Sequence, residues 1–183
     1  MKKYQIIYAD PPWPIRWIGG KNFKIKPLQY PTLPVTEIGL LPVKEIVDDH
    51  SRLFLWTTNA FLPEALGIVR LWGFHYDKLW TWCKLSSSGG HPRNATEHLI
   101  EATRGSLGQK LGKNDKATNN WFIAKRGKHS QKPKNIRDFI DKCYPDAKKI
   151  ELFARQKVEG WDCIGYDIDG VDINEAINRI AQG

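Results

Sequence analysis

The sequence predicts an α/β domain built on a central, mostly parallel β-sheet that is flanked by helices. The chain has 183 residues, which is enough for a single domain with one core, and 41% of them are hydrophobic. Strand-like runs also alternate with helical ones, as in α/β proteins. Ligands in this architecture bind beyond the carboxyl ends of the strands, so residues that directly follow strands are the first candidates for function. We expect residues 1–183 to form one domain.

Short apolar or alternating runs are expected to form the strands. The first run, 4–9, is apolar almost throughout, which is typical of a buried strand. The other candidate strands are 52–57, 77–84, 97–103, 121–124, 149–153 and 161–166.

Three segments between or after these runs show the apolar spacing of helices. Asn59 is expected to cap the first helix, and Gly73 is expected to end it. The second helix opens at Pro133, and its apolar residues recur at the i, i+3, i+4 and i+7 positions of one helical face. Asp172 resembles the first residue of a capping box and is expected to begin the last helix.

Three further segments, near 14–35, 84–96 and 105–120, lack such patterns and are expected to be loops that contact the substrate. The chain holds 28 basic and 20 acidic side chains, and its net charge of +8 is concentrated in residues 84–134, which hold 11 basic and three acidic side chains. Such a concentration suits a surface that faces nucleic-acid phosphates. The alternative is a solvated basic face without a partner.

Several classes of protein are not expected. No apolar run approaches the roughly 20 residues that span a bilayer, and the start of the chain lacks a signal-peptide core. Cys83, Cys143 and Cys163 are widely spaced and form no CxxC pair, so neither a zinc site nor a disulfide framework is expected. We therefore expect a cytoplasmic protein without a metal and without membrane contact.

The segment Asp10-Pro11-Pro12-Trp13 follows the first predicted strand directly, so we expect it to be the catalytic turn. Two consecutive prolines make this turn stiff and leave its carbonyl groups as hydrogen-bond acceptors, to which Asp10 adds a carboxylate. Such acceptors suit an NH₂ group, and orienting a weakly nucleophilic amine can contribute roughly 7–11 kcal/mol. Trp13 offers a ring on which a flipped-out base could stack. The alternative is an ordinary turn with a buried tryptophan.

This turn resembles the catalytic motif of the MT-A70 family, the adenine-N6 methyltransferases that include the catalytic subunit of the eukaryotic mRNA writer. The resemblance runs from Tyr4 to about Asp167 and keeps the family's order of motifs. Its other segments are Tyr30-Pro31-Thr32-Leu33, Leu53-Phe54-Leu55-Trp56, Leu71-Trp72-Gly73-Phe74, Glu97-His98, His129-Ser130-Gln131-Lys132-Pro133, Glu151-Leu152-Phe153-Ala154-Arg155 and Gly160-Trp161-Asp162. It implies a permuted Rossmann-like methyltransferase fold that uses S-adenosyl-L-methionine to methylate the N6 amine of a flipped-out adenine.

The cofactor implied by this resemblance needs partners for its carboxylate and its ribose hydroxyls. Arg155 can bind a carboxylate, Glu151 can accept from hydroxyls, and Ser130 with Lys132 precede a helix N-terminus that favours an anion. The expected cofactor site comprises Asp10, Pro11, Arg104, Ser130, Lys132, Glu151, Arg155 and Asp167. The alternatives are that Glu151 and Arg155 pair only with each other and that Ser130 only caps the helix.

Residues 14–30 mix basic and aromatic side chains and contain no acid, which suits phosphate contact together with base stacking. The expected substrate contacts are Trp13, Arg16, Trp17, Lys21, Lys24, Tyr30, His91, Arg93 and Asn94. DNA is the preferred polymer, because the short bacterial and phage relatives that this chain resembles usually act on it. RNA remains open.

Two other functions compete with this interpretation. A non-catalytic partner subunit would bind nucleic acid beside an active sister chain, but such subunits in the family lose the acid or the aromatic residue of the turn, and both Asp10 and Trp13 are present. A cytosine-N4 methyltransferase more often has serine in place of Asp10. The sequence leaves open whether the protein is a monomer or a homodimer.

Overall fold

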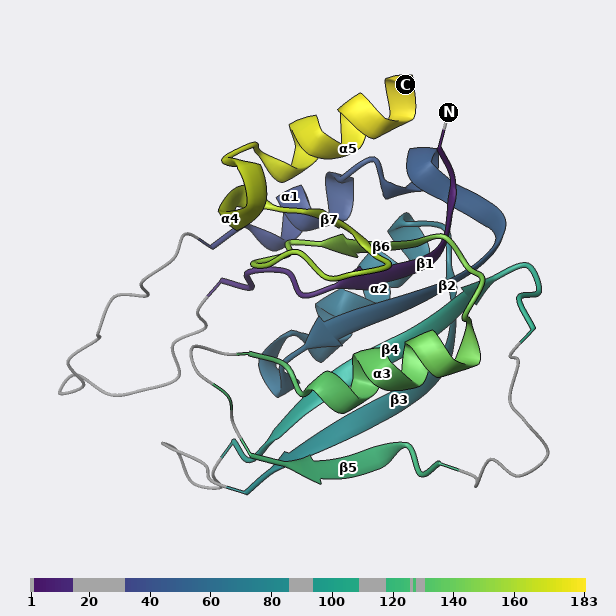
Figure 1. Cartoon of the computed structure of the whole chain (residues 1–183). Helices are drawn as coiled ribbons and strands as arrows, with labels where there is room; N and C mark the ends of the chain where they lie inside the picture. The colour runs from purple at the N-terminus through teal and green to yellow at the C-terminus, as the bar shows by residue number, and fades with distance from the viewer. Residues whose placement is uncertain (1, 15–31, 86–93, 109–117, 126, 128–130) are drawn as a thin grey trace, which may run out of the picture.

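Within the residues that the structure describes, seven strands form one β-sheet (Figure 1). The computed structural model describes residues 2–14, 32–85, 94–108, 118–125, 127 and 131–183. The strands are β1 (Tyr4–Ala9), β2 (Val47–Thr57), β3 (His75–Lys84), β4 (Thr96–Arg104), β5 (Trp121–Ala124), β6 (Lys149–Leu152) and β7 (Asp162–Ile164). The helices are α1 (Val35–Leu40), α2 (Leu62–Leu71), α3 (Lys134–Cys143), α4 (Tyr166–Asp169) and α5 (Ile173–Gln182), with 3-10 turns η1 (Val43–Ile46) and η2 (Asn59–Phe61).

The sheet is mostly parallel, as predicted, and its strands follow the order β5-β3-β4-β2-β1-β6-β7. The central strand β1 runs parallel to β2 and β6, β7 runs parallel to β6, and β5 runs parallel to β3. Only β4 is antiparallel to its neighbours β2 and β3 among the described strands. The carboxyl ends of the parallel strands therefore gather at one edge, to which β4 contributes its first residues. We call this the carboxyl edge.

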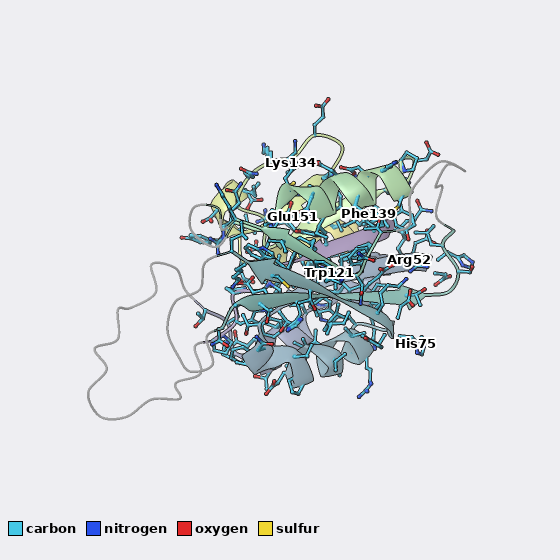
Figure 2. All side chains as sticks on the ribbon, turned by 90° about the horizontal axis from the view of Figure 1, so that it is seen from below. Arg52, His75, Trp121, Lys134, Phe139 and Glu151 are labelled. Carbon is cyan, nitrogen blue, oxygen red and sulfur yellow. The ribbon has the colours of Figure 1, made fainter. Side chains whose placement is uncertain are left out.

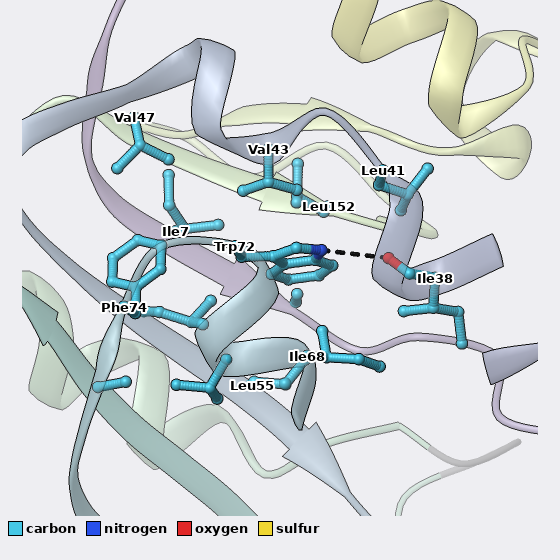
Figure 3. Packing of buried hydrophobic residues seen from close by; sticks show 14 of the residues in the cluster. Ile7, Ile38, Leu41, Val43, Val47, Leu55, Ile68, Trp72, Phe74 and Leu152 are labelled. Carbon is cyan, nitrogen blue, oxygen red and sulfur yellow. Dashed lines mark hydrogen bonds between the residues drawn. The ribbon is translucent and has the colours of Figure 1, made fainter. Parts of the chain in front are cut away.

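One face of the sheet is covered by α1, α2, α5 and η1 (Figures 1 and 3). Ile7, Leu55 and Leu152 point from three neighbouring strands into this core and are fully buried. Each such side chain contributes about 1.5–3 kcal/mol through the removal of apolar surface from water. Trp72 lies in the middle of this core and donates its indole N–H to the Ile38 carbonyl at 3.1 Å, which ties the end of α2 to α1 (Figure 3).

The opposite face is covered by α3, whose Ile136, Ile140 and Cys143 are buried. This confirms the helical stripe predicted from their spacing. Beneath α3 the sheet presents large aromatic side chains, and the Trp56 indole donates its N–H to the Tyr8 hydroxyl at 2.7 Å. We call Tyr8 and Trp56 the aromatic floor. Tyr8 and Trp56 are each one residue before the end of their strands, β1 and β2, and so lie next to the carboxyl edge.

Most predicted elements are present, with different lengths. The strands predicted at 4–9 and 121–124 have these bounds, whereas β2 begins earlier than predicted, at Val47. The sequence did not predict α1, η1 or α4, which are too short to show helical periodicity. Among the described residues, no helix combines the length and apolarity that crossing a bilayer requires.

The two predicted helix caps have opposite outcomes. The side chain of Asp172 accepts from the backbone N–H groups of the second and third residues of α5, at 2.9 and 3.3 Å, so this prediction is confirmed. The prediction for Asn59 is wrong, because α2 begins after Phe61 and has no side-chain cap. Asn59 instead bonds to Thr96 and His98 of β4, which offer its amide better-placed partners than the helix does.

Candidate active site

The chain turns sharply at the carboxyl edge, where β1 ends and Asp10 follows. The Trp13 N–H donates to the Pro11 carbonyl at 2.9 Å, and the Leu33 N–H donates to the Pro12 carbonyl at 3.0 Å. These bonds, together with the fixed φ angles of the two prolines, make the turn rigid. The two carbonyl groups therefore already accept one hydrogen bond each, and each has a second lone pair for a ligand.

Trp13 is fixed by contacts at its ring edge and on one ring face. Its indole N–H donates to the Trp56 carbonyl at 3.0 Å, and its ring stacks on Phe61 with 5.6 Å between ring centres and 15° between ring planes. Phe61 thus covers one face of the Trp13 indole. A base could stack on the other face, which is the role predicted from the sequence.

The carboxylate of Asp10 is bound by Lys132, which precedes α3. The Lys132 ammonium lies 2.8 Å from an Asp10 oxygen, 3.3 Å from Glu97 and 5.4 Å from the ring centre of Trp56. Burial by itself would lower the pKa of Lys132, but the charges of Asp10 and Glu97 outweigh burial and raise the pKa. The structure places the ammonium of Lys132 against Asp10, and the cofactor role expected for Lys132 stays a prediction.

Glu97 connects a second lysine to this cluster. Lys84 lies 2.6 Å from Glu97, and its side chain is only 5% exposed, so its ammonium is almost withdrawn from water. Burial would raise the pKa of Glu97, but Lys132 and Lys84 hold that pKa below its ordinary value. Asp10, Lys132, Glu97 and Lys84 thus form a row of alternating charges, which we call the charge row.

Sequence reasoning assigned no role to Glu97 or Lys84. Both are charged residues at the ends of predicted strands. Charged side chains are rarely buried unless they are paired, so a buried lysine or glutamate at such a position suggests an ion pair. That signal does not say which charges meet. Only the antiparallel register of β3 with β4 brings the end of one strand to the start of the other.

A second ion pair lies one strand away, on β6. Arg137 of α3 donates to a Glu151 oxygen at 2.7 Å, and its guanidinium lies 5.4 Å from the ring centre of Tyr8. Burial raises the pKa of Glu151, Arg137 offsets part of that increase, and Asp10 adds to it. Each ring of the aromatic floor thus makes a cation–π contact, Trp56 with Lys132 and Tyr8 with Arg137.

A cleft of about 630 Å³ opens between the ends of β1 and β6 and the start of α3. Asp10 and Glu151 both line it, and so do Lys132 and Arg137. Figure 2 shows Glu151 near Lys134, the first residue of α3, toward one end of the sheet. The volume falls within the range of pockets for small molecules and cofactors.

The chain leaves β6 in an unusual conformation that borders this cleft. Phe153 has a φ of 61°, in the left-handed region that non-glycine residues rarely adopt. The N–H of the next residue, Ala154, bonds to the Ile164 carbonyl at 2.9 Å, and Arg155 then lines the cleft. Gly165 packs against the backbone of Ala154, and a Cβ at position 165 would lie only 2.5 Å from the Ala154 carbonyl oxygen. Such strain often accompanies a functional site.

The structure does not bring Arg104 to this cleft. Arg104 ends β4, pairs in register with Ser51 and binds Asp49 at 3.2 Å. Because β4 is antiparallel, its last residue lies at the end of the sheet opposite the carboxyl edge, which Arg52 and His75 mark in Figure 2. The cofactor role predicted for Arg104 therefore does not fit its position.

Other predicted residues lie apart from the cleft or outside the described part of the chain. Asp167 is exposed in α4 and does not line the cleft, although α4 follows β7 at the carboxyl edge. Asn94 is exposed just before β4, at the same edge. The predicted residues outside the described ranges are Arg16, Trp17, Lys21, Lys24, Tyr30, His91, Arg93 and Ser130.

Comparisons with known proteins show similarity to methyltransferases. The MT-A70 family model matches residues 4–167. The type II methyltransferase M.MunI of a Mycoplasma species is 34% identical, over 91% of this chain and 78% of that protein. The human N(6)-adenosine-methyltransferase catalytic subunit METTL3 is 27% identical, over 93% of this chain but 29% of that protein. The N6-methyladenosine RNA methyltransferase MTA1 of Cryphonectria parasitica is 28% identical, over 90% of this chain and 52% of that protein.

Proposed function

The chain belongs to the MT-A70 family of methyltransferases, and we propose that it transfers a methyl group from S-adenosylmethionine to the N6 amine of adenine in DNA. The main support is the position of Asp10. This carboxylate follows the central strand, lines the cleft and is held by a largely buried lysine. An acceptor in such a place can orient an amine toward an electrophile.

Asp10 and the rigid turn supply what the amine requires. The N6 amine has two protons to donate, and its lone pair is delocalised into the purine ring. Asp10 accepts one proton in a hydrogen bond, and the second lone pair of the Pro11 carbonyl is the nearby acceptor for the other. Fixing the nitrogen between two acceptors aligns its lone pair and removes part of the orientational cost of the reaction. Lys132 prevents Asp10 from rotating away from this position.

The residues of the cleft fit S-adenosylmethionine. Glu151 offers a carboxylate to the ribose hydroxyls, and Arg155 offers a guanidinium to the methionine carboxylate. The cleft also contains an incompletely bonded group, because the buried Nε of Arg137 has no hydrogen-bond partner among the described residues. When bound, the cofactor supplies an electrophilic methyl group on a sulfonium. Asp10 and Glu151 line one cleft, which would place substrate and cofactor side by side.

The charge of the chain favours a nucleic acid as the substrate, and the comparisons favour DNA over RNA. The net charge of +8 suits a polyanion, and the basic excess falls between residues 84 and 134. The chain matches a type II methyltransferase over 78% of that protein, whereas it matches METTL3 over 29% and the RNA methyltransferase MTA1 over 52%. Similarity to most of a type II methyltransferase is more consistent with a DNA substrate than with an RNA substrate.

The proposal is tested by incubating the protein with labelled S-adenosylmethionine and separate DNA and RNA pools, followed by digestion to nucleosides. We expect labelled N6-methyldeoxyadenosine from DNA. Label in N6-methyladenosine from RNA would overturn the choice of polymer, and label in cytosine or in neither pool would overturn the proposed reaction.

The role of Asp10 is tested with Asp10→Asn, which keeps the size of the side chain but removes its charge. We expect methyl transfer to fall by at least about 10²-fold, because the amine loses its anionic acceptor, while calorimetric binding of S-adenosylmethionine is largely retained. Asp49→Asn is the matched control, because Asp49 is 88% exposed and lies at the opposite end of the sheet. Unchanged transfer by Asp10→Asn would contradict the assigned role.

A further inference from the structure

Two carboxylates of the cleft are each paired with a cation from the same short segment of chain. Lys132 binds Asp10 after β1, and Arg137 binds Glu151 on β6. Tyr8 and Glu151 are neighbours in the parallel register of β1 with β6. Because side chains alternate along a strand, Asp10 leaves β1 toward the same face as Tyr8. Both acids and the aromatic floor therefore face α3, and the segment at its start can reach both.

We propose that Arg137 is a positioning residue for the cofactor: it holds Glu151 as a carboxylate with one oxygen directed to the ribose hydroxyls of S-adenosylmethionine. This inference rests on the proposed function and concerns a residue for which no role was predicted from the sequence. Arg137 acts through Glu151 rather than on the reacting atoms. Its expected influence is on cofactor affinity, whereas Lys132 is expected to influence the transfer step.

The geometry of the pair suits this task. Arg137 bonds to Oε2 of Glu151, which leaves Oε1 as an acceptor for a hydroxyl group. The two side chains are 17% and 11% exposed, so water contributes little to holding either charge. The guanidinium is planar and lies at the Tyr8 ring, and the Tyr8 hydroxyl is itself held by Trp56. The Tyr8 ring thus restricts the position of the Arg137 guanidinium, and Arg137 in turn restricts the position of the Glu151 carboxylate.

The charges around Glu151 show why it needs this partner. Arg137 is the cation that faces it from α3, whereas Asp10 of the catalytic turn adds a like charge. Tyr8 on β1 and Cys163 on β7 are its register neighbours and remain uncharged, because burial raises the pKa of each. A largely buried carboxylate that loses its cation in such surroundings takes up a proton more readily. Protonated Glu151 would be a poorer acceptor for hydroxyl groups.

The test measures binding of S-adenosylmethionine by calorimetry between about pH 6 and pH 8.5, because loss of Arg137 should make affinity depend on pH. The variants are Arg137→Gln, Arg137→Lys and the matched control Lys142→Gln, which removes an exposed cation from the last turn of the same helix. For wild type and the control we expect nearly constant affinity across this range. For Arg137→Gln we expect affinity about tenfold weaker at the acid end, where a larger fraction of Glu151 is protonated, and partial recovery at the alkaline end, where Glu151 is again a carboxylate.

A thermodynamic cycle with Glu151→Gln separates positioning from a general loss of structure. If Arg137 acts through Glu151, then Arg137→Gln should weaken binding much less in the Glu151→Gln background than in the wild type. Arg137→Lys keeps a charge and should retain the wild-type dependence on pH even where its affinity is lower. It also provides a folded variant if Arg137→Gln does not fold.

The outcomes distinguish this inference from the proposed function. If the wild type binds no S-adenosylmethionine, the proposed function fails. If the wild type binds it and Arg137→Gln binds equally well at every pH, the cofactor assignment stands and the role of Arg137 is refuted. Equal losses in both backgrounds of the cycle would also refute positioning through Glu151.

Discussion

Replacing Lys132 with methionine tests whether a buried cation orients the carboxylate of Asp10, the proposed catalytic residue. Methionine keeps most of the apolar stem and removes the charge. The Lys132 side chain is 14% exposed and lies between Asp10 and Glu97, which are 24% and 17% exposed. Removing one partner from a buried ion pair costs about 3–5 kcal/mol. Because both acids retain some contact with water, we expect the free energy of unfolding to fall by about 3 kcal/mol.

The same substitution should impair methyl transfer more than cofactor binding. Without Lys132, the carboxylate of Asp10 can rotate, and a displacement of about 1 Å at a reacting group can cost on the order of 10²-fold in rate. We therefore expect kcat to fall by about 10²-fold. Binding of S-adenosylmethionine should change little, because Glu151 keeps its own cation, Arg137.

The pH dependence of stability gives an independent check. Glu97 has a pKa below its ordinary value of 4.5, so its ion pairs stabilise the protein fully above that pH, and this contribution is lost as the pH falls through the folded-state pKa. Lys132 has a pKa above its ordinary 10.5, so its contribution is present below that pH and is lost as the pH rises through the folded-state value. In Lys132→Met the alkaline loss should disappear, and the acid loss should shrink because Glu97 keeps only Lys84 of its two lysines.

Urea unfolding followed by tryptophan fluorescence measures the stability, and single-turnover transfer measures the chemical step. Lys142→Met is the matched control, because it removes an exposed lysine from α3, and we expect a change within about 0.5 kcal/mol. If Lys132→Met keeps both its stability and its rate, then the charge row neither stabilises the fold nor orients Asp10.

Two comparisons of paired variants test the strained end of β6. Phe153→Gly should be more stable than Phe153→Ala by about 1 kcal/mol, because both lose the ring and only glycine adopts a φ of 61° without strain; in urea unfolding, the reverse order would exclude backbone strain at this position. Gly165→Ala should lose about 1–3 kcal/mol or more, because its Cβ would lie 2.5 Å from the Ala154 carbonyl oxygen. Gly67→Ala, a helical position with open space around it, should instead gain about 0.5–1 kcal/mol, and equal effects at the two glycines would contradict the close approach.

The parts of the fold that could be predicted from the sequence depend on local physics. Residues 4–9 are apolar almost throughout, which is typical of a buried strand, and the two prolines at 11 and 12 stiffen the turn that follows. Asp172 caps α5 because its carboxylate reaches N–H groups two and three residues ahead. In each case the partner lies within a few residues, so the sequence alone contains the information.

The positions of the charged side chains could not be predicted in the same way. Arg104 is the last residue of its strand and Asp10 directly follows β1, but β4 runs in the opposite direction and takes Arg104 away from the carboxyl edge. Asn59 has the residue type of a cap, yet it bonds to residues of β4 that are distant in sequence. These outcomes depend on strand direction and register, which emerge only when the whole sheet is assembled.

The position of the aromatic floor explains why the cations that pair with Asp10 and Glu151 both come from the segment at the start of α3. Register places Glu151 beside Tyr8, and alternation along β1 sends Asp10 to the same face of the sheet. Because α3 covers that face, the cations that allow both carboxylates to be buried have to come from its start, and Lys132 and Arg137 are those cations. A cation on the opposite face would be separated from both acids by the sheet. The same packing that buries Ile136 and Ile140 therefore also sets the charges at the two positions where substrate and cofactor are proposed to bind.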